Sequence, residues 1–175
     1  LAWLAAIGLM RSRSRALLIA TAARVVVTLV AGSRVSAAIG GLATSSSVGS
    51  WYATLNKPSF NPPSAVFGPV WTTLYILMAL AAWRVWRSLA ADDKRRRALT
   101  LYGVQLALNL AWSLIFFGLR RPDLAMIDIA VLLAAIVATT AAFARVDRPA
   151  AWLMAPYVAW VSFASALNFA IWRLN

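Results

Sequence analysis

The sequence contains no cysteine and no histidine, and aspartate supplies all five of its acidic residues. Without cysteine there is no disulfide framework, no thiolate nucleophile and no Cys-ligated metal. Without histidine, the commonest metal ligand and the commonest general base are missing as well. We therefore expect no metal site, no required cofactor and no conventional catalytic triad.

Charge is scarce and apolar residues are abundant. Hydrophobic residues make up 62% of the 175 positions and charged residues only 13%, which is far too apolar for an ordinary soluble domain. A bilayer core of roughly 30 Å needs about 20 apolar residues per helix, so this length accommodates about five spans. The composition predicts an all-α integral membrane protein folded as one five-helix transmembrane bundle.

The apolar runs place these spans at approximately 25–46, 65–83, 98–119, 124–144 and 150–172. Residues 1–23 are interpreted as a basic and apolar N-terminal extension to a transmembrane domain at 24–175. A basic loop at 92–97 separates the second and third spans. Two tight turns carry Pro122 and Pro149 near helix starts, where the missing N–H of proline costs little.

The net charge of +12 comes from basic residues that lie mostly between the apolar runs. This pattern is typical of loop charges that orient helices in a membrane, so nucleic-acid binding is not expected. With five alternating spans, most basic residues fall on one side, which predicts a cytoplasmic N-terminus. The other side receives Lys57, Arg120, Arg121 and Arg173.

The first long loop contains Lys57-Pro58-Ser59-Phe60-Asn61-Pro62-Pro63. Proline restricts its own backbone and that of the preceding residue, so this stretch is not a regular helix. We expect a stiff lid over the outer mouth of the bundle.

Small residues recur at intervals of four in the third span, at Gly103, Ala107 and Ala111. Such a row lets two helix backbones approach closely. The row is consistent with packing inside the bundle or with a homodimer interface.

Helical spacing brings amides and aromatic residues onto shared faces of the third and fifth spans. Because amides are costly in hydrocarbon, these faces should point inward, either for interhelical hydrogen bonds or to line a cavity. Trp71 and Tyr75 of the second span offer flat faces to a planar ligand. The residues on these inward faces of the third and fifth spans are Gln105, Asn109, Trp112, Tyr157, Trp160, Ala164 and Asn168.

Other tryptophans lie at span ends, as in an interfacial belt: Trp83, Trp86, Trp152 and Trp172. Arg34 and Asp128 are charges within the predicted spans, and each is costly there unless paired or hydrated. They are candidates to pair with each other.

Several segments, in order, resemble the TspO/MBR family of tryptophan-rich sensory proteins. They are Trp51-Tyr52-Ala53-Thr54-Leu55-Asn56-Lys57-Pro58 with Phe60-Asn61-Pro62-Pro63, then Val66-Phe67-Gly68-Pro69-Val70-Trp71 with Leu74-Tyr75, then Gln105-Leu106, Leu108-Asn109, Trp112, Phe116-Phe117, Pro156-Tyr157, Trp160 and Leu167-Asn168. The resemblance covers about residues 29–175.

The resemblance implies a five-helix bundle, usually a homodimer, that binds porphyrins and benzodiazepine-type ligands in a pocket closed by the first loop. The matching pocket residues are Tyr52, Phe67, Trp71, Asn109, Trp160 and Ala164. Two departures are Ser59, where many bacterial members have tryptophan, and Phe169, where the animal sterol motif has tyrosine. Cholesterol binding is therefore not expected.

Three functions follow from the resemblance. The leading one is a regulatory membrane protein that binds tetrapyrroles such as protoporphyrin IX or haem. The second is light- and oxygen-dependent porphyrin breakdown, a reaction that would use Trp71 and Trp160. The third is a porphyrin transporter, although the sequence has no inverted repeat of the kind many carriers contain. The arginine- and alanine-rich composition points to a bacterial inner membrane.

Overall fold

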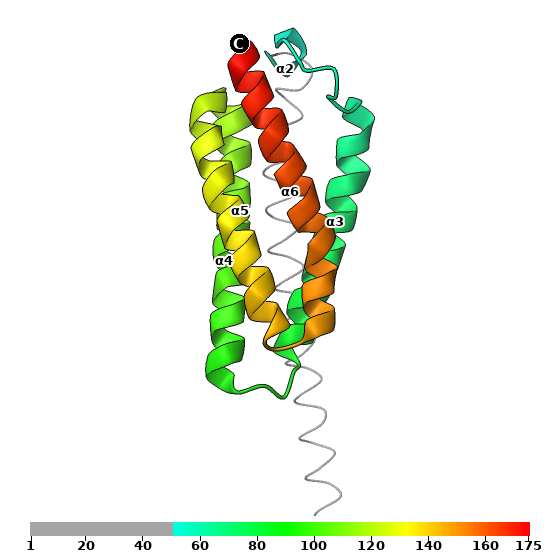
Figure 1. Cartoon of the computed structure of the whole chain (residues 1–175), viewed down its shortest axis with the longest axis vertical. Helices are drawn as coiled ribbons and strands as arrows, with labels where there is room; N and C mark the ends of the chain where they lie inside the picture. The colour runs from blue at the N-terminus through cyan, green and yellow to red at the C-terminus, as the bar shows by residue number, and fades with distance from the viewer. Residues whose placement is uncertain (1–50) are drawn as a thin grey trace, which may run out of the picture.

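The computed structural model describes residues 51–175, and within this range it is helical with no strand. Four long helices follow a short one, and Figure 1 shows them side by side in a bundle. The elements are α2 (Trp51–Thr54), α3 (Ser64–Trp86), α4 (Asp92–Ser113), the π-helix η1 (Leu114–Gly118), α5 (Pro122–Ala144) and α6 (Arg148–Leu174). The predicted all-α class is confirmed.

Four of the predicted spans correspond to helices that are long and apolar enough to cross a membrane. They run over Ser64–Trp86, Asp92–Gly118, Pro122–Ala144 and Arg148–Leu174, with mean hydropathy between 1.4 and 2.3. The chain is an integral membrane protein. The predicted first span at 25–46, with Arg34 and the extension at 1–23, lies outside the described residues.

The predicted loop at 92–97 is wrong, because these residues form the first turns of α4. The connection from α3 is only the segment 87–91. Asp92 and Asp93 stand in the first turn, where negative charge is favourable at the positive end of the helix dipole. Asp92 also pairs with Arg95 one turn later. Helix α4 therefore continues beyond its apolar stretch.

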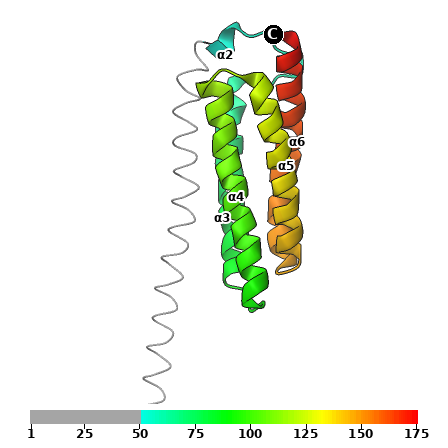
Figure 2. The ribbon, with the colours of Figure 1, turned by 90° about the vertical axis from the view of Figure 1, so that its left-hand side faces the viewer.

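The other helix starts agree with the proline positions. Pro122 is the first residue of α5, and Pro149 is the second residue of α6. At these positions the absent N–H would have no helical partner in any case. The two turns join α4 to α5 and α5 to α6 as antiparallel neighbours (Figure 2).

The segment 51–63, which we call the lid, crosses one end of the bundle and comprises α2 and the proline-rich stretch after it. Figures 1 and 2 both show it beside the last turn of α6. Residues 55–63 contain no helix, as predicted. The lid lies at the end of the bundle opposite the 87–91 connection (Figure 1).

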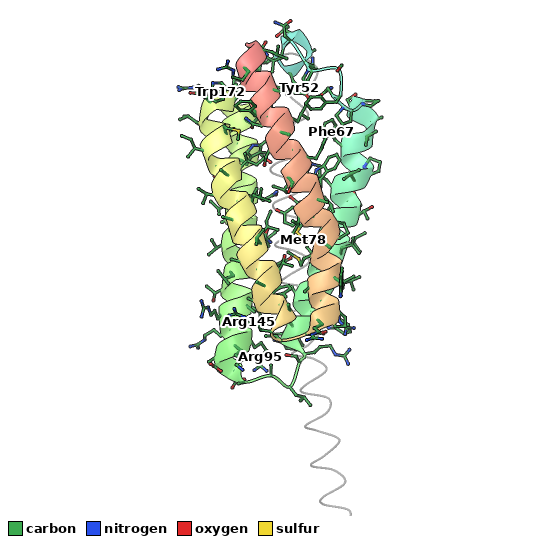
Figure 3. The ribbon with its side chains drawn as sticks, in the orientation of Figure 1. Tyr52, Phe67, Met78, Arg95, Arg145 and Trp172 are labelled. Atoms are coloured by element: carbon green, nitrogen blue, oxygen red, sulfur yellow. The ribbon has the colours of Figure 1, made fainter. Side chains whose placement is uncertain are left out.

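That opposite end, which we call the basic end, carries most of the charge in the described part of the chain. Figure 3 shows Arg95 and Arg145 there, with Tyr52 and Trp172 at the lid end. The described helices therefore alternate as the sequence predicts. Arg120, Arg121 and Arg173 lie with the lid, and the more numerous basic residues of 84–97 and 145–148 lie at the basic end.

Candidate functional site

The candidate site begins where α3 and α6 separate. The two helices lie close together at the basic end and diverge toward the lid (Figure 1). Aromatic rings fill the space between them: Phe67 of α3 and Trp160 of α6 have ring centroids 5.9 Å apart. Phe163 continues the row, 5.6 Å from Trp160 and 6.3 Å from Phe60 of the lid.

A chain of hydrogen bonds joins three helices deeper in the bundle. The hydroxyl of Tyr75 in α3 donates to Asn109 Oδ1 in α4 at 2.7 Å. Asn109 Nδ2 donates to the hydroxyl of Tyr157 in α6 at 3.2 Å. Trp71 lies on this chain, 5.6 Å from the ring of Tyr75 and 6.3 Å from that of Tyr157. We call these three hydrogen-bonded residues, Tyr75, Asn109 and Tyr157, the floor, because they lie below the aromatic row on the side away from the lid.

Gln105, one helical turn from Asn109, has no solvent exposure. Neither its amide oxygen nor its amide nitrogen has a hydrogen-bond partner within residues 51–175. A buried polar group left unpaired costs about 1–3 kcal/mol. Gln105 therefore holds unused donor and acceptor capacity next to the floor.

Trp112 and Asn168 form a second polar contact, nearer the lid. Trp112 Nε1 donates to Asn168 Oδ1 at 3.1 Å, and Asn168 Nδ2 donates to the carbonyl of Pro122 at 2.9 Å. The contact ties α4 and α6 to the start of α5. This pair supports the interhelical interpretation of the Asn168 amide. Ala164 is half-buried and packs against the same core cluster as Trp71 and Trp160.

Tyr52 lies in a cluster between the lid and η1, against which Phe67 of α3 and Phe163 of α6 also pack. It packs on Phe116 and Phe117, with ring centroids at 6.2 and 5.8 Å. Its hydroxyl donates to Asn61 Oδ1 at 2.8 Å. Burial raises the pKa of Tyr52 above its ordinary value, and the hydrogen bond to Asn61 partly offsets that rise. Tyr52 thus fixes the fold of the lid.

The π-helical turn η1 presents both phenylalanines to the lid. Its wide turn is marked by a 2.8 Å hydrogen bond from the Leu119 amide to the Leu114 carbonyl, five residues back. Phe116 stacks on Trp112 at 5.1 Å, while Phe117 meets the same indole edge-on at 5.9 Å. The π turn therefore links the lid to Trp112.

Sequence reasoning missed a polar contact between the lid and α6. The backbone N–H of Asn56 donates to Asn175 Oδ1 at 2.9 Å, and Asn175 Nδ2 donates back to the backbone carbonyl of Asn56 at 3.0 Å. The two residues are 119 positions apart. Two asparagines in polar segments give no signal that would pair them in advance.

The small-residue row of the third span does not pack inside the described bundle. Gly103 and Ala107 are exposed, and Ala111 is half-buried. A Cβ added to Gly103 would meet no atom within 4 Å among the described residues. Because α3, α5 and α6 do not cover Gly103 and Ala107, packing against the predicted first span and a homodimer interface both stay predictions for this row.

Asp128 is half-buried in α5. Its Oδ2 is buried and has no hydrogen-bond partner within residues 51–175. The suggested pairing with Arg34 involves a residue outside that range, so it stays a prediction.

The described site lies within a segment that matches a known family. Residues 24–173 match the TspO/MBR family. The chain belongs to this family. The match covers the lid and all four long helices, up to Arg173 in α6.

The matches to individual relatives cover most of each relative's length. The chain is 48% identical over 127 residues to the tryptophan-rich protein TspO of Chlorobaculum tepidum, spanning 72% of this chain and 80% of that one. It is 46% identical over 126 residues to the human translocator protein, spanning 71% and 75%. Protein CrtK of Rhodobacter capsulatus is 42% identical over 129 residues, spanning 74% and 81%.

Proposed function

We propose that this TspO/MBR protein binds a tetrapyrrole, such as protoporphyrin IX or haem, against the aromatic rings of α3 and α6 beneath the lid. The observation that carries the proposal is the placement of Trp71 and Trp160 on facing helices, above the floor formed by Asn109. Benzodiazepine-type ligands, which are also flat and apolar, would occupy the same place.

The chemistry of the site suits a planar apolar ring. Aromatic contacts add about 0.5–1.5 kcal/mol each beyond the burial of area, and a few polar groups then fix the orientation of the ligand. Trp71, Trp160 and Phe67 are only half-buried, so part of each ring is left uncovered.

Binding coupled to regulation fits this site better than conventional catalysis. The chain has no cysteine, histidine or glutamate to act as nucleophile or general base. A relative from Cereibacter sphaeroides, 43% identical over 125 residues, is named a tryptophan-rich sensory protein. We propose a role in porphyrin-linked regulation or stress response, in which the lid reports the occupancy of the site.

The test is a titration of detergent-purified protein with protoporphyrin IX in the dark. Porphyrin absorbance is followed together with tryptophan fluorescence, because removing indoles alters the fluorescence signal by itself. We expect saturable binding that weakens roughly tenfold in a Trp71→Phe, Trp160→Phe double variant, because each phenyl ring covers less of the porphyrin than the indole it replaces.

The matched control is Trp152→Phe. Trp152 lies on the same helix as Trp160 but is 77% exposed and lies near the basic end, so its substitution should leave binding unchanged. Unsaturable binding, or equal binding by parent and double variant, would remove the porphyrin assignment.

We further propose that two copies associate through Gly103, Ala107 and Ala111 on the outer face of α4. Small residues at this spacing allow close helix approach in a membrane. Gly103→Phe should convert dimers to monomers in light scattering of detergent-purified protein, while Ala134→Phe on an exposed face of α5 should not. Because a side chain at Gly103 meets no described atom, a monomer that still folds is expected; persistence of the dimer would refute this interface.

The proposed location is a bacterial inner membrane, with the basic end and the N-terminus on the cytoplasmic side, because basic loops are retained there. The absence of cysteine allows clean labelling of single introduced thiols. An impermeant maleimide added to intact cells should label Ser59→Cys in the lid and should not label Arg96→Cys. The reverse pattern would invert the topology.

A further inference from the structure

A cavity of about 200 Å³ opens at the basic end, well away from the aromatic row. It is lined by Arg84 and Arg87 at the end of α3, by Ser88 in the connection that follows, and by Asp147 before α6. The porphyrin proposal makes no use of this cavity. Its lining contains two cations and one anion.

The Arg84–Asp147 pair forms one wall and leaves donor capacity unused. Arg84 Nη2 donates to Asp147 Oδ1 at 3.3 Å. Arg84 Nε lies 3.0 Å from Oδ2, but its N–H is not aligned with any acceptor in the described protein, and the atom is buried. The Arg84 side chain is still 41% exposed, and its Nη1 donates to no acceptor within residues 51–175, so Nη1 can bind a further acceptor without giving up Asp147.

Arg87 supplies the uncompensated charge. Its guanidinium lies over the ring of Trp83, 4.6 Å from the centroid, and it makes no ion pair within residues 51–175. Stacking on an indole orients a guanidinium while leaving its edge free. Planar guanidinium edges are well suited to phosphate oxygens.

The surroundings add positive potential. Arg95 donates from Nη1 to the Ser88 carbonyl at 3.2 Å and pairs with Asp92. With Asp147, Asp92 and Asp93 make three carboxylates at this end. The basic residues outnumber these acids, since they include Lys94, Arg96, Arg97, Arg145 and Arg148 as well.

The cavity lies at the depth of lipid headgroups. Trp83 and the exposed Trp152 lie at this end of α3 and α6, and tryptophans at span ends mark the membrane interface. Toward the bundle centre, α3 exposes Leu80 and Ile76, at 44% and 56%. A phosphate held in the cavity could therefore place attached acyl chains along an apolar helix face.

We propose that this cavity binds the phosphodiester headgroup of an anionic phospholipid, with Arg87 and Arg84 as the phosphate ligands. Basic pockets between transmembrane helices bind such headgroups through the same chemistry. A free phosphate ion would meet the same cations, but it would gain nothing from the apolar face beside them.

The test measures lipid retention by native mass spectrometry of the detergent-purified protein, titrated with phosphatidylglycerol or phosphatidylcholine. We expect one preferred phosphatidylglycerol per chain. Arg87→Gln should weaken its binding about tenfold, as expected for loss of a charge-assisted contact. Arg87→Lys keeps the charge but not the planar edge, so its affinity for phosphatidylglycerol should lie between those of the parent and Arg87→Gln.

Arg97→Gln is the matched control. It removes the same charge from the same end of the molecule, but Arg97 does not line the cavity, so we expect at most about a twofold change from diffuse attraction. Equal losses in Arg87→Gln and Arg97→Gln, or equal retention of both lipids, would overturn the site. Full competition by millimolar inorganic phosphate would identify a free-anion site and overturn the lipid assignment.

Discussion

The side-chain amide of Asn109 joins Tyr75 to Tyr157, accepting from the first hydroxyl at 2.7 Å and donating to the second at 3.2 Å. One amide in α4 thus connects α3 and α6 at the level where those helices begin to diverge. Asn109 and Tyr157 are buried, and Tyr157 belongs to the core cluster against which Trp71 and Trp160 pack. Loss of the Asn109 amide should affect both stability and the site.

Asn109→Ala should destabilise the protein by about 1 kcal/mol. Interhelical hydrogen bonds in membranes contribute about 0.6 kcal/mol each on average, and this substitution removes two. Tyr75→Phe, which removes one of them and keeps the ring, should cost about half as much. Unfolding in mixed micelles with increasing SDS measures both, and equal stability of Asn109→Ala and parent would show that the bridge contributes nothing.

Asp128→Asn should stabilise the protein by about 1 kcal/mol or more, because it replaces a costly charge within a membrane span by a neutral group of the same size. The described residues offer Asp128 Oδ2 no partner. The same SDS titration measures whether the substitution raises or lowers the free energy of unfolding. Destabilisation would instead indicate an ion pair with a residue outside 51–175, for which Arg34 is the predicted partner; Arg34→Gln would then be destabilising as well.

Asn175→Ala should loosen the lid. The Asn56 amide hydrogen is bonded to Asn175 Oδ1, so hydrogen exchange at Asn56 reports the contact directly. A neutral hydrogen bond contributes about 0.5–1.5 kcal/mol, which predicts exchange about two- to tenfold faster. The buried amide of Met78 in α3 serves as the internal reference; unchanged exchange at Asn56 would mean that the lid is held by its aromatic contacts alone.

Ala164→Phe should reduce porphyrin affinity by tenfold or more, because it fills space beside Trp160 with a second large side chain. The half-buried Ala164 packs against the same buried cluster as Trp71 and Trp160, and it lies one helical turn from Trp160. Ala159→Phe is the control, since Ala159 lies on the exposed face of the same helix. Dark titration with protoporphyrin IX measures both variants, and equal affinity would place the ligand elsewhere.

Hydropathy and proline positions were sufficient to predict four helices and the lid, because long apolar runs and Pro-rich breaks are local properties. The predicted start of the span at residue 98 was wrong by six residues, because α4 begins at Asp92. The charged residues 92–97 indicate a loop by hydropathy, but Asp92 stabilises a helix start. Burial of Gln105, Asn109, Tyr157 and Asn168 agrees with the inward faces inferred from helical spacing.

The partners of these buried groups could not be predicted. The Asn56–Asn175 contact depends on how the lid crosses the bundle, and the Tyr75–Asn109–Tyr157 chain depends on the relative heights of three helices. Helical spacing fixes the direction of a side chain but not its neighbour. Likewise, Arg84 and Asp147 are 63 positions apart, and only the packed turns bring them to one cavity.

The π-helical turn bears on how the chain tolerates insertions and deletions. A π turn holds one residue more than an α turn, so Leu114–Gly118 absorbs a surplus residue without pushing the next helix out of place. Deleting a single residue here should preserve the length of the hairpin while rotating Phe116 and Phe117 apart. When family members are aligned, a one-residue gap at this point would therefore mark those in which the contact between lid and hairpin is built differently.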